Sequence, residues 1–298
     1  MMRNFKNYIP IFFSTLFWGM SFIWTKDLLN AGFTPTIIIT LRVSIAAIIL
    51  YAIFKTTGKL DKIDRKDYKW FMLLALFEPF LYFFGENWGL SYLDASIGSL
   101  IISTIPIFVP FGLFFFHKEP LRWQIIIGVV LTILGLLVIS FSKGSAYSIN
   151  SKGVMLMFAA VFSAVGYSVV LHRVIKNYGA ITITTTQNII GSIYYLPFFF
   201  GFELKNLKGL DFSLSTIYPL LALAILCSAI AFICFSYSAK KLSVAKTTVF
   251  TNAVPIVTIL FALFLGKEVM TTNKLFGMLI VLLGVYLSQK DFKRKIKT

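Results

Sequence analysis

The stretch Tyr92–Ile139, YLDASIGSLIISTIPIFVPFGLFFFHKEPLRWQIIIGVVLTILGLLVI, decides how this chain of 298 residues is organised, because the chain contains it twice. Moved forward by 149 positions, it aligns without a gap with Lys241–Ser288. Residues of uncommon types coincide in the two copies, namely Pro106 with Pro255, Lys118 with Lys267, Glu119 with Glu268, Gly128 with Gly277 and Gly135 with Gly284. An internal duplication in an apolar chain is typical of a transporter.

The composition indicates a membrane protein. Hydrophobic residues make up 58% of the chain and charged residues only 13%, whereas soluble proteins have about 25% charged residues. A span needs about 20 mostly apolar residues, and its backbone must satisfy its own hydrogen bonds as a helix. We therefore expect an all-α membrane protein with ten transmembrane helices, near residues 9–28, 36–54, 70–91, 95–116, 122–141, 153–173, 181–201, 215–238, 244–265 and 273–289.

The duplication predicts two inverted halves. Each copy holds five spans, an odd number, so the second copy enters the membrane upside-down relative to the first. The first five-helix repeat is expected over 1–142, the second over 153–289, and a basic cytoplasmic tail over 290–298. A weaker match at an offset of 145 places Thr40 on Thr185 and Arg42 on Gln187.

The net charge of +16 does not indicate a nucleic-acid partner, because of how it is distributed. Twenty of the 28 Lys and Arg residues lie at the termini and in alternate connections between spans. The positive-inside rule then places both termini in the cytoplasm, with the chain crossing the cell membrane many times.

The only cysteines, Cys227 and Cys234, share one predicted span and give neither a disulfide framework nor a metal-binding spacing. No metal and no cofactor is expected.

Three charged residues lie well away from the ends of predicted spans, where charges usually face protein or water. Arg42 and Glu86 both lie roughly 8–9 Å from the outer end of their helices at 1.5 Å per residue. Their matching depth and opposite signs predict an ion pair, with a structural or a functional role. Glu78 is deeper and lacks an obvious partner. It is a candidate proton carrier, a silent hydrogen-bonded acid or a residue of a water-filled cavity.

The fourth and ninth spans share a polar half that ends at a proline. Because the helices are inverted, these halves approach the midplane from opposite sides, and Pro106 and Pro255 are predicted to kink them and act as hinges. This arrangement is typical of a two-sided pathway, while hydrogen bonding between helices is the alternative explanation. The polar residues are Ser96, Ser99 and Ser103 in the fourth span and Thr247, Thr248, Thr251 and Asn252 in the ninth.

Other repeated features are predicted to be structural. Glu119 and Glu268 each precede a helix, whose positive end a carboxylate stabilises. The paired glycines of the fifth and tenth spans allow close packing, either within the chain or across a homodimer.

Trp18, near the midplane of the first span, either packs between helices or lines a cavity. We expect the substrate-binding residues to be Trp18, Tyr82, Glu86, Ser99, Ser103, Tyr167, Gln187 and Asn252.

These features together resemble the EamA-type family of the drug/metabolite transporter superfamily. The resemblance depends on the two five-span repeats, Trp18–Gly19 in the first span, Arg42 in the second, and the doubled pattern from Pro106 to Glu119 and from Pro255 to Glu268. It implies alternating access for small organic solutes, often amino acids and often in the export direction. It also implies a central cavity bounded by the first, third, fourth, sixth, eighth and ninth spans.

The predicted function is an inner-membrane transporter of small metabolites, either an amino-acid or metabolite exporter or a facilitator. Aromatic side chains would hold an apolar part of the substrate, hydroxyl and amide groups its polar ends, and Glu86 an amine or a proton. A zwitterionic or amphipathic molecule suits that mixture. The alternatives are a lipid scramblase or flippase, and an integral-membrane enzyme, for which two histidines and no paired acids give little chemistry.

Overall fold

The apolar runs become helices throughout the part of the chain that a computed structural model describes, residues 8–118, 123–140 and 150–289. No β-strand occurs in these ranges. The first half contains α1 (Ile9–Asn30), α2 (Pro35–Thr56), α3 (Tyr68–Ala75), α4 (Tyr82–Tyr92), α5 (Ala95–Ile102), α6 (Ile105–His117) and α7 (Gln124–Ser140). The second half contains α8 (Ser151–Val174), α9 (Ala180–Phe198), α10 (Leu214–Ala222), α11 (Phe232–Leu242), α12 (Val244–Thr248), α13 (Val254–Phe264) and α14 (Thr272–Gln289).

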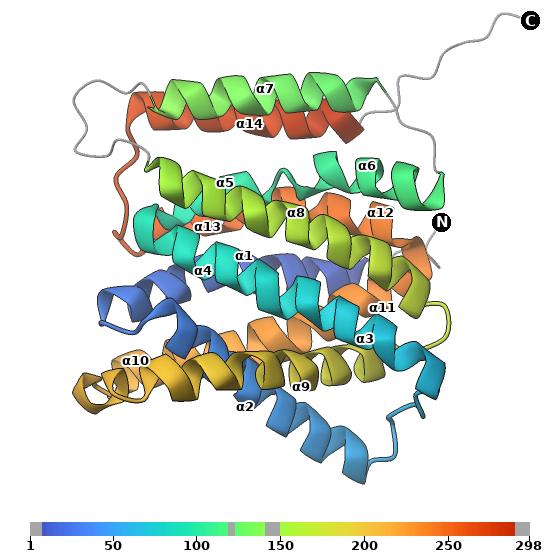
Figure 1. Cartoon of the computed structure of the whole chain (residues 1–298). Helices are drawn as coiled ribbons and strands as arrows, with labels where there is room; N and C mark the ends of the chain where they lie inside the picture. The colour runs from blue at the N-terminus through green and yellow to red at the C-terminus, as the bar shows by residue number, and fades with distance from the viewer. Residues whose placement is uncertain (1–7, 119–122, 141–149, 290–298) are drawn as a thin grey trace, which may run out of the picture.

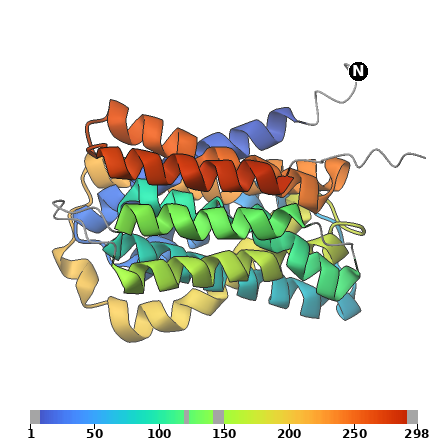
Figure 2. The ribbon, with the colours of Figure 1, turned by 90° about the horizontal axis from the view of Figure 1, so that it is seen from above.

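The predicted membrane-spanning character is present in this fold. Five helical stretches of the described residues are long and apolar enough to cross a membrane, namely Pro35–Thr56, Ala95–His117, Ser151–Val174, Leu214–Leu242 and Val244–Phe264. The other predicted runs also coincide with helices, and the long axes lie roughly side by side in one bundle (Figures 1 and 2). The protein is therefore an all-helical, multi-pass membrane protein.

Two helical stretches contain π-helical turns at positions that match in the two halves. Segment η3 (Leu76–Leu81) joins α3 to α4, and segment η6 (Leu223–Ala231) joins α10 to α11. Moved by 149 positions, η3 falls inside η6. Within η3 the backbone of Glu78 is extended, with φ −147° and ψ 119°. Such interruptions of a helix are frequent at functional sites.

Pro106 and Pro255 each lie in the first turn of a new helix. Helix α5 ends at Ile102 and α6 begins at Ile105, so the predicted kink at Pro106 is a break between two helices. In the second half, α12 is followed by the 3-10 segment η7 (Val249–Ala253), and α13 then begins at Val254. A proline is well tolerated in a first turn, because the N–H that it lacks would have no helical partner there.

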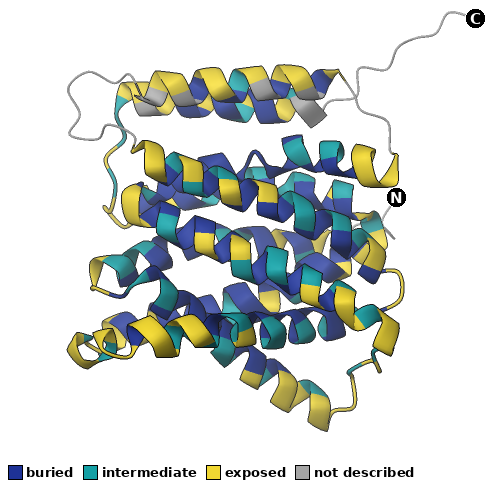
Figure 3. Cartoon of the chain, viewed as in Figure 1, coloured by how far each residue is buried: buried dark blue, intermediate teal, exposed yellow. Residues whose placement is uncertain are grey.

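Helices α7 and α14 form a pair at one edge of the bundle, with an exposed outer surface (Figures 1 and 3). A Cβ atom on Gly135 would lie 2.6 Å from the carbonyl oxygen of Gly277, and one on Gly284 would lie 3.0 Å from the carbonyl oxygen of Gly128. These contacts are reciprocal, since Gly128 matches Gly277 and Gly135 matches Gly284. The glycines thus pack within the chain.

Helix α1 lies inside the bundle, in contact with α4, α5, α11 and α13. Its approach to α13 depends on Gly19, where an added Cβ would lie 2.5 Å from Cβ of Val257. The hydroxyl of Thr258 donates a hydrogen bond of 2.8 Å to the carbonyl oxygen of Gly19. This close contact fixes the neighbouring Trp18 at the centre of the molecule.

Candidate functional site

A cavity of about 50 Å³ lies at the centre of the bundle. Its walls come from α1, α2, η3, α4, α5, α6, α8, α11, α12, η7 and α13, which includes all six spans that the resemblance implied. A water needs roughly 10–15 Å³ of such space, so the cavity has room for a few waters. Eight of the residues singled out from the sequence line it, namely Trp18, Arg42, Glu78, Tyr82, Glu86, Tyr167, Thr248 and Thr251.

Arg42 supplies the positive charge of the cavity, and its side chain is buried. Its Nε donates a hydrogen bond of 2.9 Å to Oγ of Ser228 in η6. The guanidinium carbon lies 4.1 Å from the centre of the Phe83 ring, a cation–π contact. Its Nη1 has no hydrogen-bond partner among the described residues. A buried charged donor therefore remains available at the cavity wall.

Glu86 is also buried and is held by neighbours on its own helix. The hydroxyl of Tyr82, one turn earlier, donates a 3.1 Å hydrogen bond to Oε1, and Nδ2 of Asn87 lies 3.4 Å from Oε2. Among the described residues Glu86 forms no salt bridge with Arg42, so the expected direct ion pair is absent. The guanidinium instead lies against Phe83, one helical turn from Glu86. Helix rotation, which depth alone does not reveal, separates the two charges.

Glu78 lines the cavity from η3, where its extended backbone interrupts the helix. Within the described ranges, no hydrogen bond reaches its carboxylate from another side chain or from the backbone. Of the roles considered from the sequence, its place matches an acid in a polar cavity. Its counterpart in the second copy is Cys227, so only the first half contributes an acid here.

Aromatic rings form much of the remaining wall. Trp18 packs against Phe232 and Phe235, with ring centres 5.1 Å and 5.2 Å away. Its Nε1 donates to the carbonyl oxygen of Cys227 at 3.3 Å. Trp18 thus both packs between helices and lines the cavity. The hydroxyl of Tyr167 donates to Oε1 of Gln187 at 3.4 Å. Gln187 itself does not line the cavity, and it orients Tyr167, which does.

Several of the predicted site residues lie away from the cavity. Ser99 and Ser103 are fully buried, and their hydroxyls donate to the backbone carbonyl oxygens of Ser96 and Leu100 in the preceding turn. This local hydrogen bonding satisfies the serines without a ligand. Asn252, Pro106 and Pro255 are also absent from the lining. The ninth span contributes hydroxyls through Thr248 and Thr251 instead of an amide through Asn252.

Matching positions of the two copies meet in the cavity wall. Lining residues pair at the offset of 149 as Phe83 with Phe232, Glu86 with Phe235, Ile102 with Thr251, and Ile105 with Val254. The weaker offset of 145 pairs Phe22 with Tyr167. Applying the repeat to Glu86 would have found Phe235 from the sequence alone. The lining residues not selected from the sequence are Ser21, Phe22, Phe83, Ile102, Ile105, Ala164, Ser168, Phe232, Phe235 and Val254.

One end of the bundle is closed by charged contacts. Nζ of Lys267 lies 2.5 Å from the carboxylate of Asp27 on α1. The carboxylate of Glu268 accepts a 3.0 Å hydrogen bond from the backbone N–H of Ser96 and another from its hydroxyl. Glu268 therefore caps α5 of the first half, a contact that we did not predict. Its effect on the helix that follows it stays a prediction. Glu119 lies outside the described residues.

The opposite end has polar contacts within the second half and between the two halves. Nζ of Lys240 on α11 donates to the carbonyl oxygen of Tyr178 at 2.8 Å. The carboxylate of Asp61 accepts hydrogen bonds from the N–H of Gly179 at 2.6 Å and from the hydroxyl of Thr182 at 3.0 Å. Polar contacts therefore join elements of the bundle at both of its ends.

The fold and the charged residues in its small central cavity define a multi-pass membrane protein with a buried candidate site. The chain belongs to the EamA-like transporter family, whose pattern it matches twice, over residues 6–141 and 151–289. A solved crystal structure shares the fold with a TM-score of 0.70 at 17% identity, covering 95% of this chain and 97% of its own.

The names of similar proteins are consistent with membership of that family. An uncharacterized transporter of Archaeoglobus fulgidus is 28% identical and covers 95% of this chain and 98% of its own length. The uncharacterized transporter YdfC of Bacillus subtilis is 26% identical over 85% of this chain and 81% of its own. A probable terminal-alkyne amino-acid exporter of Streptantibioticus cattleyicolor is 29% identical over 67% of this chain and 66% of its own. Family and names indicate a transporter and not an enzyme.

Proposed function

We propose that this protein moves a small zwitterionic or amphipathic metabolite across the cytoplasmic membrane by alternating access, as an amino-acid or metabolite exporter or facilitator. The proposed architecture is ten spans in two inverted five-helix repeats, 1–142 and 153–289, with both termini in the cytoplasm. The reciprocal glycine contacts of α7 and α14, and the η3 and η6 segments at matching positions, support this architecture. The positive-inside distribution of Lys and Arg supports the orientation.

The unpartnered Nη1 of Arg42 is the observation that carries this proposal. A buried donor without a partner costs about 1–3 kcal/mol, and more when it is charged. A substrate carboxylate next to Arg42 would remove that cost. Glu86 and Glu78, in the same cavity, suit the ammonium group of the same substrate. The name of the amino-acid exporter relative agrees with this chemistry.

The aromatic wall suits an apolar portion of the substrate. Trp18, Phe83, Phe232 and Phe235 place ring faces and edges around the cavity. Because about 50 Å³ is too small for a metabolite of several heavy atoms, the site must widen to bind one. The helix breaks at Pro106 and Pro255 are where such a movement would bend the fourth and ninth spans.

The test is uptake of a labelled amino-acid mixture by proteoliposomes that contain the purified protein, with and without an imposed pH gradient. Saturable uptake that requires Arg42 is the expected result. Accumulation above equilibrium only with the gradient would indicate proton coupling, and equilibration that ignores the gradient would indicate a facilitator. Movement of labelled lipid without uptake of amino acids, nucleosides or sugars would overturn the proposal in favour of a scramblase.

A further inference from the structure

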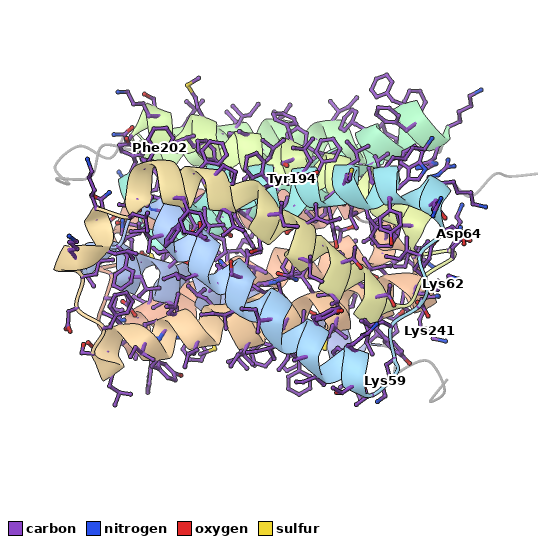
Figure 4. All side chains as sticks on the ribbon, turned by 60° about the horizontal axis from the view of Figure 1, so that its bottom comes forward. Lys59, Lys62, Asp64, Tyr194, Phe202 and Lys241 are labelled. Carbon is purple, nitrogen blue, oxygen red and sulfur yellow. The ribbon has the colours of Figure 1, made fainter. Side chains whose placement is uncertain are left out.

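A second cavity, which we call the interfacial groove, lies far from the central one. It has a volume of about 670 Å³ and lies between the end of α2, the connection 57–64, the start of α3 and the first turns of α9. Helix α2 is long and apolar enough to cross a membrane, so its end at Thr56 marks a membrane boundary. Lys59, Lys62 and Asp64 lie at this end of the bundle, as does Lys241 (Figure 4).

The two sides of the interfacial groove differ in chemistry. Tyr51, Phe54 and Ile189 form an apolar side on the bodies of α2 and α9. Lys62 and Arg65, from the connection to α3, form a basic side together with Lys55 at the end of α2. Among the described residues, none of these three cations takes part in a salt bridge. The groove therefore has an apolar part directed along the membrane and a positive part at its boundary.

The single acid of the groove lining does not neutralise this charge by pairing with a cation. The carboxylate of Asp61 caps the start of α9, where it accepts hydrogen bonds from Gly179 and Thr182. In contrast, Thr185 in the lining has a buried side chain, 1% exposed, whose Oγ1 has no hydrogen-bond partner in the described ranges. Three cations and one unpartnered hydroxyl are thus available to a ligand that accepts hydrogen bonds.

We propose that the interfacial groove binds one anionic phospholipid from the adjacent leaflet. Its phosphate would lie among Lys55, Lys62 and Arg65, and its acyl chains would follow Tyr51, Phe54 and Ile189. Basic pockets between spans at the membrane boundary bind anionic headgroups, and the long stems of Lys and Arg reach the boundary from the helix ends. The bound lipid would hold the connection 57–64 against α9, whose first turn Asp61 already caps.

The experiment measures lipid selectivity directly. The full-length protein is reconstituted into phosphatidylcholine vesicles that contain a trace of spin-labelled phosphatidylglycerol or spin-labelled phosphatidylcholine, and electron paramagnetic resonance gives the protein-bound fraction of each. The wild type is expected to prefer phosphatidylglycerol. The triple variant Lys55→Gln, Lys62→Gln and Arg65→Gln is expected to lose about fivefold of that preference per charge removed.

Control variants separate a specific site from general charge. The triple variant Lys152→Gln, Lys205→Gln and Lys208→Gln also removes three charges, and none of these residues lines the interfacial groove. It is expected to keep the wild-type preference, and equal losses in both triple variants would overturn the proposal. Thr185→Val, which keeps the side-chain shape, is expected to lower the preference about threefold.

Inorganic phosphate distinguishes the lipid from a soluble anion. At millimolar concentration and constant ionic strength, phosphate is expected to leave the bound fraction of phosphatidylglycerol unchanged. Displacement of the labelled lipid by phosphate as effective as that by unlabelled phosphatidylglycerol would overturn the proposal. These outcomes do not depend on solute transport, so they stand apart from the proposed function.

Discussion

The ammonium group of Lys267 lies 2.5 Å from both carboxylate oxygens of Asp27, which joins the connection between α13 and α14 to α1. Lys26, the residue before Asp27, donates hydrogen bonds to the carbonyl oxygens of Leu90 and Leu93 at 2.8 Å and 2.9 Å. Both halves of the duplication therefore meet at this end of the bundle. In the proposed alternating-access cycle, a passage between α1, α5 and α13 would open here only after these contacts separate.

Asp27→Asn is expected to open this end more often. A partly exposed ion pair contributes about 0.2–1 kcal/mol, which corresponds to as much as about a fivefold change in the open population. The measurement is maleimide labelling of a cysteine introduced at Ser21, in a chain whose two native cysteines are replaced by serine. The double variant Asp27→Lys, Lys267→Asp restores the pair and is expected to restore slow labelling. Labelling at the wild-type rate in Asp27→Asn contradicts a closing role.

Arg42→Lys is expected to weaken binding of carboxylate-bearing substrates although it keeps the positive charge. Lysine lacks the planar group that stacks on Phe83 and the Nε that bonds Ser228. A hydrogen bond to a charged group contributes about 1.5–3 kcal/mol, so the apparent KM should rise by about tenfold or more. Proteoliposome uptake of an amino acid and of its decarboxylated amine measures this. An equal effect on both compounds would assign Arg42 to the structure and not to the substrate.

Ser228→Ala is the matched control for Arg42. It removes the partner of Nε and leaves the guanidinium with its charge and its contact with Phe83. We expect it to change KM less than Arg42→Lys does.

Glu86→Gln is expected to abolish accumulation driven by a pH gradient and to leave only equilibrating uptake. Glutamine keeps an oxygen that accepts from Tyr82 and has nearly the same shape, but it has no charge and no proton to exchange. The measurement is the ratio of internal to external substrate with and without the gradient. Tyr82→Phe removes the hydrogen bond and should preserve the gradient dependence. We would abandon a role for Glu86 if Glu86→Gln transported at the full rate at every pH.

Gly135→Ala is expected to lower the thermal stability. The new Cβ would lie 2.6 Å from the backbone oxygen of Gly277, so α7 and α14 would have to separate. Overpacking of this kind costs about 1–3 kcal/mol. Thermal denaturation in detergent would show a lower midpoint. Gly201→Ala is the control, since no atom lies within 4 Å of its Cβ. Equal midpoints for the two variants would mean that the α7–α14 contact is loose.

The sequence predicted the helices well because twenty-residue apolar runs have few other solutions in a bilayer. It also identified the three charged cavity residues Arg42, Glu78 and Glu86, since a charge inside a span is rare enough to stand out. Trp18, Tyr82 and Tyr167 were found by depth alone.

The predicted site residues that lie outside the cavity were selected without knowledge of helix rotation. A serine in a span satisfies itself as readily with its own backbone as with a ligand, as Ser99 and Ser103 do. Apolar residues such as Phe232 look the same in sequence whether they face lipid or a cavity. The contact of Glu268 with α5 was not predicted, because its partner, Ser96, is 172 residues away in the chain.

Some positions that match in the two halves carry unlike residues, so the cavity wall is chemically asymmetric. Glu86 has Phe235 as its counterpart, and Ile102 has Thr251. Two identical half-length chains would have built a symmetric chamber in which a ligand could lie either way round. In the fused chain, the two ends of the proposed substrate would meet different surroundings. Exchanging the residues, with Glu86→Phe and Phe235→Glu together, would turn the preferred ligand end for end.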